Sequence, residues 1–237
     1  MTTIKELINL NGRRALITGA TGGLGRVMAS TLAELGADLI LVDISSSDIE
    51  SLSKNLTNNW GIKVESYFCD LEQQDQRSDL IEFIKASGRE LNILVNNAAF
   101  VGSSGLQGWS VPFEDQSIET WRRALEVNLT SIFDICQNLT PLMRNSEGAT
   151  IINIASTYGL YGPDWSLYKN TDMSNPAAYS ASKGGVIQLT RWLSTTVAPD
   201  IRVNSISPGG IFRNCLLYTS DAADDLLCVD LGGRRII

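Results

Sequence analysis

The sequence of 237 residues contains no histidine. This absence excludes Ser-His-Asp and Cys-His nucleophilic catalysis and every histidine-ligated metal site. Acid–base chemistry must therefore use tyrosine, lysine or a carboxylate. The four cysteines are scattered and form no CxxC pair, so we expect neither a metal nor a disulfide framework; they are Cys69, Cys136, Cys215 and Cys228.

The sequence also has no excess of basic residues and no long apolar stretch. The net charge is −7 and the isoelectric point about 4.7, which disfavours a nucleic acid or an anionic membrane as partner. The N-terminus carries charges where a signal peptide needs an apolar run, and no stretch reaches the about 18 apolar residues of a membrane span. With 43% hydrophobic residues, the chain is predicted to be one cytoplasmic domain with a sizeable core.

Short segments rich in Val, Ile and Leu alternate with longer amphipathic stretches. This alternation predicts repeated βαβ units, and hence an α/β fold with a doubly wound parallel sheet covered by helices on both faces. The six predicted strands are "RALITG", "LILVD", "VESYFCD", "LNILVNNA", "ATIINIAS" and "IRVNSIS".

The stretch "ITGATGGLG" places Gly19, Gly23 and Gly25 between the first predicted strand and the helix that follows. Glycine allows a tight turn with positive φ, and its missing Cβ lets backbone N–H groups approach a pyrophosphate at the helix N-terminus. Strand, loop and helix together predict a dinucleotide site of the Rossmann type.

Asp43 closes the second predicted strand, where a carboxylate accepts hydrogen bonds from both adenosine ribose hydroxyls. It would repel a 2′-phosphate, and Gly22 and Ile44 stand where an NADP site would carry Arg or Lys. The sequence therefore favours NAD over NADP. The alternative is a solvated aspartate at a strand end.

The stretch "NPAAYSASKGGVIQLTRWL" predicts a helix capped by Asn175, with Pro176 in its first turn. Tyr179 and Lys183 are four apart and share one face. A tyrosine has an ordinary pKa of about 10, so proton transfer near neutral pH requires its anion to be stabilised by about two to three units. A neighbouring ammonium can supply part of this. Taken alone, such a pair is more often ordinary packing.

Two polar residues join this pair. Ser156 ends the fifth predicted strand, at the edge where an open parallel sheet binds its ligand, and could hold a substrate oxygen. A serine at this position is also a common cap or turn residue. Asn128 lies within a predicted helix, where asparagine is unfavourable, and this suggests a specific hydrogen-bonding role.

The sequence resembles the short-chain dehydrogenase/reductase family, in the branch with the TGxxxGxG loop. The resemblance covers residues 1 to about 214. It rests on "TGATGGLG" from Thr18, "CDL" at Asp70, "NNAA" at Asn96 to Ala99, Asn128, Ser156, "YSASK" at Tyr179 to Lys183 and "PGGI" at Pro208 to Ile211.

The resemblance implies hydride transfer between a nicotinamide and the carbon of a carbonyl or secondary alcohol. Tyr179 would be the general acid or base, and Lys183 would lower its pKa and bind the nicotinamide ribose. Ser156 would orient the substrate oxygen, and Asn128 would hold a water that relays the proton. The alternative is a non-catalytic dinucleotide-binding protein or an inactive truncated fragment.

The resemblance also implies a homotetramer or homodimer, and it assigns the contacts to NAD. Asp70 and Leu71 would lie by the adenine, Asn97 and Ala98 beside the adenosine ribose, and Ile211 at the carboxamide. The full set of implied contacts is Thr18, Gly19, Gly23, Leu24, Gly25, Asp43, Asp70, Leu71, Asn97, Ala98, Tyr179, Lys183, Pro208, Gly209 and Ile211.

Ser156 and Tyr179 are 23 positions apart, more than is usual in the family, because "YGLYGPDWSLYKNTDMSN" separates them. A loop there would overhang the reacting carbon. Its aromatic residues, interleaved with polar ones, would suit a polyhydroxy or sugar-like substrate. The alternative is a lid that packs on itself. The aromatic residues are Tyr158, Tyr161, Trp165 and Tyr168.

Residues 215–237 differ from the rest. "CLLYTSDAADD" and "CVDLGGRRII" resemble translated sequencing-adapter oligonucleotides, so we expect a domain over 1–214 followed by a non-native tail. The resemblance implies two or more helices and a seventh strand after the "PGGI" loop, but only the 14 residues 212–225 separate this loop from "LLCVDLGG", which imitates that strand. Two helices of about ten residues each do not fit there. The domain is therefore expected to lack its last strand and the helices before it.

Overall fold

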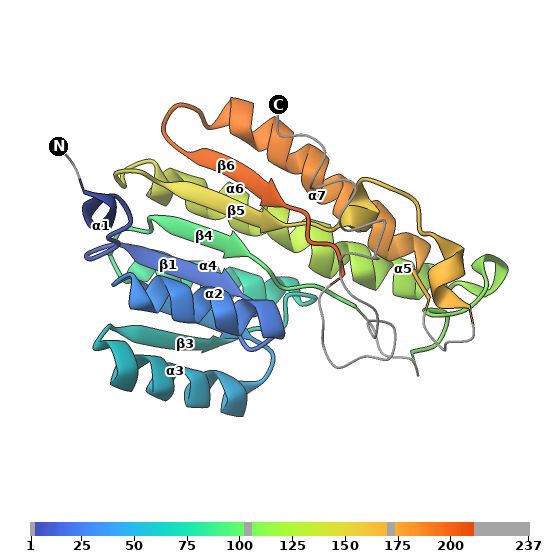
Figure 1. Ribbon diagram of the computed structural model, residues 1–237, viewed down its shortest axis with the longest axis horizontal. Helices are drawn as coiled ribbons and strands as arrows, with labels where there is room; N and C mark the ends of the chain where they lie inside the picture. The colour runs from blue at the N-terminus through green and yellow to red at the C-terminus, as the bar shows by residue number, and fades with distance from the viewer. Residues whose placement is uncertain (1–2, 102–105, 170–173, 211–237) are drawn as a thin grey trace.

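The structure, a computed structural model, describes residues 3–101, 106–169 and 174–210. These residues form a parallel six-stranded sheet in the order β3-β2-β1-β4-β5-β6 (Figure 1). Every predicted strand is present, and the doubly wound α/β fold is confirmed. The strands are β1 (Arg14–Thr18), β2 (Asp38–Asp43), β3 (Val64–Phe68), β4 (Ile93–Asn96), β5 (Thr150–Ile154) and β6 (Arg202–Ile206).

Helices connect the strands (Figure 1). The main ones are α1 (Ile4–Leu7), α2 (Gly23–Glu34), α3 (Ser46–Trp60), α4 (Gln74–Ala86), α5 (Ile118–Leu125), α6 (Ser131–Met143) and α7 (Ala177–Thr196). Shorter turns are η1 (Phe113–Asp115), the π-helical η2 (Glu126–Thr130), η3 (Thr157–Gly159) and η4 (Trp165–Tyr168). No helix in the described ranges is long and apolar enough to cross a bilayer.

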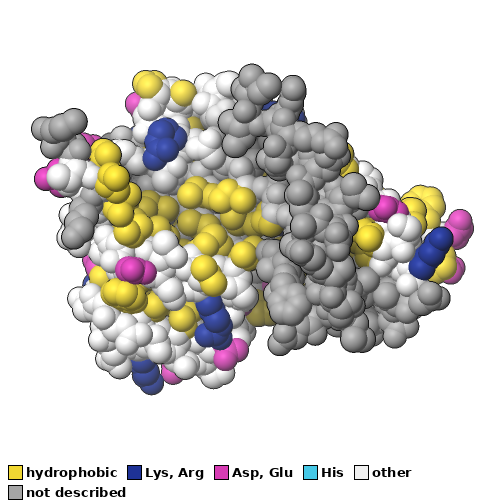
Figure 2. Space-filling view, in the orientation of Figure 1, with side chains coloured by type: hydrophobic (Ala, Val, Ile, Leu, Met, Phe, Trp, Pro, Cys, Tyr) yellow, Lys and Arg dark blue, Asp and Glu magenta, His cyan; other side chains and the backbone are white. Residues whose placement is uncertain are grey.

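The sheet separates two hydrophobic cores. Alternate residues of one strand enter different cores: Leu16 packs with α4, α6 and α7, whereas Ala15 and Ile17 pack with α2 and α3. The edge strand β6 follows the same rule, since Val203 is buried in the first core and Ile206 is 51% exposed on the other side. Hydrophobic side chains are visible on that face, over the middle of the sheet (Figure 2).

Two of the cysteines lie within the described residues, and both are buried. Desolvation raises the pKa of Cys69 and of Cys136 to about 12, so neither thiol is a nucleophile near neutral pH. Both are thiols of the hydrophobic core. Cys215, Cys228 and the whole predicted tail lie outside the described residues, as does the predicted loss of the last strand.

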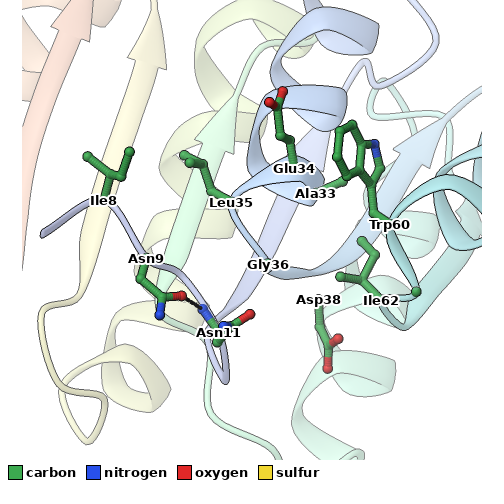
Figure 3. Close-up of a pocket in the computed structure, with 11 residues that line it drawn as sticks. Ile8, Asn9, Asn11, Ala33, Glu34, Leu35, Gly36, Asp38, Trp60 and Ile62 are labelled. Carbon is green, nitrogen blue, oxygen red and sulfur yellow. Dashed lines mark hydrogen bonds between the residues drawn. The ribbon is translucent and has the colours of Figure 1, made fainter. Parts of the chain in front are cut away.

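A cavity of about 530 Å³ opens at the amino ends of the strands (Figure 3). Ile8 borders it on one side and Trp60 on the other, with Asp38, the first residue of β2, at its rim. Open parallel sheets bind their ligands at the carboxyl ends of the strands, where β1 and β4 lie side by side and the chain order reverses. The candidate site is therefore at the opposite edge from this cavity.

Candidate active site

The glycine loop between β1 and α2 fits a pyrophosphate. Gly19 has a φ of +63°, and a Cβ there would lie 2.7 Å from the Ala98 Cα atom. A Cβ on Gly25 would lie 2.1 Å from the Gly19 carbonyl oxygen. Beside Gly23, in contrast, there is open space, and the helix begins there with Gly22 as an N-cap that has no side-chain hydrogen bond. The first N–H groups of α2 are thus available to an anion.

The ends of β1 and β4 are locked together beneath this loop. The Thr18 hydroxyl accepts hydrogen bonds from the N–H groups of Asn97 and Ala98, both at 3.1 Å. The Asn97 amide donates to the carbonyl oxygens of Thr18, at 3.0 Å, and Gly19, at 2.8 Å. Because Thr18 is almost fully buried, these hydrogen bonds hold the ends of β1 and β4 together away from solvent.

Asp43 is bound to the glycine loop and is not merely a solvated aspartate. Its Oδ2 atom accepts from the backbone N–H of Thr21 at 2.8 Å and from its hydroxyl at 2.7 Å, and Oδ1 accepts from the N–H of Ile44 at 2.8 Å. A carboxylate has about four acceptor positions, so capacity for a ribose hydroxyl remains. The nearby cation Arg26 donates to the Thr21 carbonyl and pairs with Asp48.

The loop after β3, predicted to lie by the adenine, has a defined shape. Asp70 accepts a hydrogen bond from the N–H of Glu72 at 2.9 Å, and its own N–H donates to the Gln76 side chain at 2.8 Å. Leu71 is buried, and its carbonyl accepts from the guanidinium of Arg77 at 2.6 Å. The loop is therefore fixed from the side of α4.

The same guanidinium reaches the segment that carries Asn128. Arg77 is 2% exposed and forms ion pairs at 2.8 Å with Glu126, in η2, and with Asp134, in α6. One side chain thus joins the loop after β3 to the segment that carries Asn128. The sequence did not reveal this network, because its partners lie far apart along the chain.

We expect Arg77→Met to lower the free energy of unfolding by about 2 kcal/mol, because it leaves two partly buried carboxylates without their cation. Urea denaturation measures this change. Arg191→Met on the exposed side of α7 is the matched control and should change stability by less than about 0.5 kcal/mol. Equal effects of the two substitutions would show that the network contributes no stability.

Asn128 lies fully buried in the π-helical turn between α5 and α6. Its Oδ1 atom accepts from the N–H of Phe100 at 2.6 Å, and its Nδ2 atom donates to the Phe100 carbonyl at 3.3 Å and to the Ser182 hydroxyl at 3.0 Å. Asn128 thus has the specific hydrogen-bonding role that its unfavourable position in a helix suggested. Its bonds join the loop after β4 to α7, and its water relay stays a prediction.

Helix α7 begins differently from the prediction. Its N-cap is Pro176, not Asn175, and the N–H of Ala177 donates to the side chain of Gln116 at 3.1 Å. The Asn175 oxygen instead accepts a hydrogen bond from the Ser180 hydroxyl at 3.1 Å. The predicted cap is wrong because a residue 61 positions earlier supplies the acceptor, which local sequence cannot reveal.

Tyr179 and Lys183 share one face of α7, as predicted. The ammonium of Lys183 lies 5.9 Å from the centroid of the Tyr179 ring and donates to the Ile154 carbonyl at 2.7 Å. Lys183 is 1% exposed, and burial lowers the pKa of its ammonium to about 8. Since Ile154 ends β5, the pair lies at the carboxyl edge of the sheet.

Ser156 lies two residues beyond that carbonyl and caps η3. Its hydroxyl oxygen accepts from the N–H of Tyr158 at 3.2 Å, so its role as a turn residue is present. Among the described residues, no acceptor takes its hydroxyl proton, which leaves it able to donate to a substrate oxygen.

Gly159 fixes this serine relative to the helix that carries the tyrosine and lysine. A Cβ on Gly159 would lie 2.6 Å from the carbonyl carbon of Lys183 and 2.8 Å from the nitrogen of Gly184. Only a residue without a side chain allows η3 to pack so closely on α7. Sequence reasoning missed Gly159, although a glycine three positions after the serine was a possible signal.

The "PGGI" loop approaches the same edge. The carbonyl of Pro208 accepts a hydrogen bond from the N–H of Thr157 at 3.1 Å, next to Ser156, and Gly209 is exposed. Ile211, predicted to contact the carboxamide, lies outside the described residues.

A family model described as short chain dehydrogenase matches residues 13–216. The chain belongs to the short-chain dehydrogenase family. The 3-oxoacyl-[acyl-carrier-protein] reductase FabG of Thermotoga maritima is 32% identical over 205 residues, which cover 86% of this chain and 76% of that protein. The resemblance to this family is therefore confirmed.

Solved structures agree with this membership. NAD⁺-bound xylitol dehydrogenase is 30% identical, with a TM-score of 0.73 over 86% of this chain and 73% of the other. The RhlG/NADP active-site complex of Pseudomonas aeruginosa is 28% identical, with a TM-score of 0.74 over 86% of this chain and 75% of the other. Structures similar to this family member thus bind either form of the cofactor.

The described part of the insertion between Ser156 and Tyr179 packs on itself in part, and its suitability for a sugar-like substrate stays a prediction. The hydroxyls of Tyr158 and Tyr168 hydrogen-bond to each other, so the described part of the insertion packs on itself at these rings. The ring of Trp165 lies 5.8 Å from that of Tyr168, is 57% exposed and lines a cavity.

Proposed function

We propose that the chain is an NAD(H)-dependent oxidoreductase that moves a hydride between the nicotinamide and a carbonyl or secondary alcohol carbon. The observation that carries this proposal is the buried ammonium of Lys183, 5.9 Å from the Tyr179 ring centroid. Bound in the glycine loop, the cofactor supplies or accepts the hydride. Burying a cation costs free energy. This cation lies beside a tyrosine at the ligand edge of the sheet, and its cost therefore supports a function for the pair.

In the direction of reduction, the Tyr179 hydroxyl donates its proton to the carbonyl oxygen of the substrate. The ammonium of Lys183 stabilises the resulting phenolate and hydrogen-bonds to the nicotinamide ribose. The Ser156 hydroxyl donates a hydrogen bond to the same substrate oxygen and orients it. Asn128 holds α7 in place and binds a water that returns a proton to the phenolate of Tyr179. In oxidation the same steps run in reverse.

NAD is proposed as the cofactor because the Asp43 carboxylate would repel a 2′-phosphate. Gly22 and Ile44, which flank this position, carry no charge. The remaining contacts are proposed for Gly19, Gly23, Leu24, Gly25, Asp70, Leu71, Asn97, Ala98, Pro208, Gly209 and Ile211, with Thr18 acting from below.

We expect Asp43→Ser to weaken NADH binding about tenfold, because hydrogen bonds to a charged acceptor contribute about 1.5–3 kcal/mol. Binding of NADPH should become tighter, since the repulsion is removed. Fluorescence titration measures both dissociation constants, and Glu50→Gln, at an exposed carboxylate in α3, should change neither. Tighter binding of NADPH than NADH by the unmodified chain would contradict the assignment.

The proposed substrate is a polyhydroxy or sugar-like carbonyl or alcohol. Support comes from the exposed ring of Trp165 and the polar residues around it in the insertion. Consumption of NADH in the presence of polyhydroxy and unsubstituted ketones tests the proposed activity. Binding of NADH without consumption on any ketone would favour a non-catalytic dinucleotide-binding protein.

We propose that the protein is a homo-oligomer in the cytoplasm, a homotetramer or homodimer as in related enzymes. Its proposed partner is a small-molecule substrate. The acidic net charge of −7 supports the exclusion of nucleic acid. Size-exclusion chromatography with light scattering tests the oligomeric state.

A further inference from the structure

A cavity of about 610 Å³ lies between the loop before α5, the insertion and the start of α7. This volume is within the range of small-molecule sites, about 300–1,000 Å³. None of the residues proposed above for catalysis or cofactor binding is among the described residues that line it. The lining residues are Ser110, Val111, Pro112, Phe113, Gln116, Pro163, Trp165, Ser174, Asn175, Ala177 and Ser180.

Asn175 gives this cavity an unused hydrogen-bonding group. The side chain lines the cavity, and the residue is only 5% exposed. Its Oδ1 atom accepts from Ser180, but its Nδ2 atom has no partner among the described residues. A buried donor without a partner costs free energy, so a ligand oxygen that accepts this hydrogen bond recovers the cost.

The lining defines the chemistry of the ligand. None of the described lining residues is charged, and the exposed acidic residues Glu114 and Asp115 follow Phe113 in the chain, which disfavours an anion. The walls combine aromatic and proline surfaces with serine hydroxyls. Gln116 is already used, since its oxygen accepts from Ala177. These features fit a neutral group that presents an apolar face to a ring and hydroxyl oxygens to Asn175.

The cavity adjoins the reaction centre along α7. Ser180 directly follows Tyr179, and Asn175 precedes Tyr179 by four residues. A helical turn advances about 5.4 Å, so the backbone of Asn175 lies about one turn before that of Tyr179.

We propose that this cavity binds the distal, hydroxyl-bearing part of the substrate, with the Asn175 amide donating to a hydroxyl oxygen and Trp165 packing on the apolar face. The proposal rests on the proposed function in one respect, that the other end of the same molecule reacts at Tyr179. Asn175 is a specificity-determining residue in this account and takes no part in proton transfer.

A binding experiment tests the site without turnover. Calorimetry with the NADH-bound protein, in which an alcohol has no hydride acceptor, and with xylitol or sorbitol as probe should give binding that Asn175→Ala weakens at least tenfold. Asn175→Asp retains the volume but not the donor and should weaken it similarly, whereas Asn59→Ala, an exposed amide on α3, should change nothing. The NADH dissociation constant shows that each variant is folded. Absence of polyol binding, or binding unchanged by Asn175→Ala, would overturn the proposal.

Turnover separates this proposal from the proposed function. Asn175→Ala should lower kcat/KM for the polyol about tenfold, mainly through KM, and leave kcat/KM for 3-pentanol unchanged. Turnover of the polyol with unchanged kcat/KM in Asn175→Ala would overturn the cavity proposal alone. Polyol binding that depends on Asn175, without turnover of any substrate, would support the cavity as a polyol site and overturn the proposed function.

Discussion

Tyr179→Phe is expected to lower kcat/KM for carbonyl reduction by at least about 150-fold, or about 3 kcal/mol of transition-state stabilisation. The phenylalanine ring retains the packing against the cluster of Trp109, Ala124 and Ala178 but has no proton to donate. Since the hydroxyl is needed only for the chemical step, NADH should bind with a dissociation constant within about twofold of the original. Steady-state kinetics and fluorescence titration give the two quantities.

The matched control for this substitution is Tyr161→Phe, which removes a hydroxyl from a 46% exposed tyrosine in the insertion. We expect its kcat/KM to stay within about twofold of the original. Full turnover by Tyr179→Phe would contradict the assigned role, whatever the control shows.

Lys183→Met is expected to lower kcat/KM at least about 100-fold, because the phenolate of Tyr179 loses the cation that stabilises it. The pKa of about 8 gives this prediction a pH signature. Reduction by the original chain should slow as pH rises through about 8, where Lys183 loses its proton. In Lys183→Arg the guanidinium stays charged, so this alkaline limb should move to higher pH. If the alkaline limb of Lys183→Arg stays at the same pH, a group other than Lys183 causes it.

Burial of this lysine also makes the stability of the protein depend on pH. The pKa is about 8 in the native state and about 10.4 in the unfolded chain, so the unfolded chain binds more protons between these values. The free energy of unfolding should therefore rise from pH 8 towards pH 10. Urea denaturation at several pH values should show this rise in the original chain, and a smaller one in Lys183→Met. An equal rise of the free energy of unfolding in the original chain and in Lys183→Met would show that burial of Lys183 does not cause it.

Much of the fold followed from local patterns. Runs of Val, Ile and Leu, such as "LILVD", identify buried parallel strands because both faces of each strand are covered. The glycine loop was predictable because Gly19 and Gly25 have backbone environments that exclude a Cβ atom. The four-residue spacing placed Tyr179 and Lys183 on one face in the same way. Each of these inferences depends on neighbours in sequence.

The features that were not predicted depend on contacts between distant segments. Gln116 replaces Asn175 as the acceptor at the start of α7, and Arg77 joins Leu71 to the π-helical turn. Gly159 meets the backbone of Lys183 across the insertion. Nothing in the residues adjacent to these positions specifies such partners, so the support of the site could be found only in three dimensions.

The most direct test of the proposed activity follows the hydride itself. The chain would be incubated with NADH deuterated at the transferred position of the nicotinamide and with a polyhydroxy ketone, and the product analysed by mass spectrometry. The account predicts one deuterium on the new carbinol carbon, and none when Tyr179→Phe is incubated for the same time. Binding of NADH without deuterium transfer to any ketone would contradict the account and favour a protein that only binds the dinucleotide.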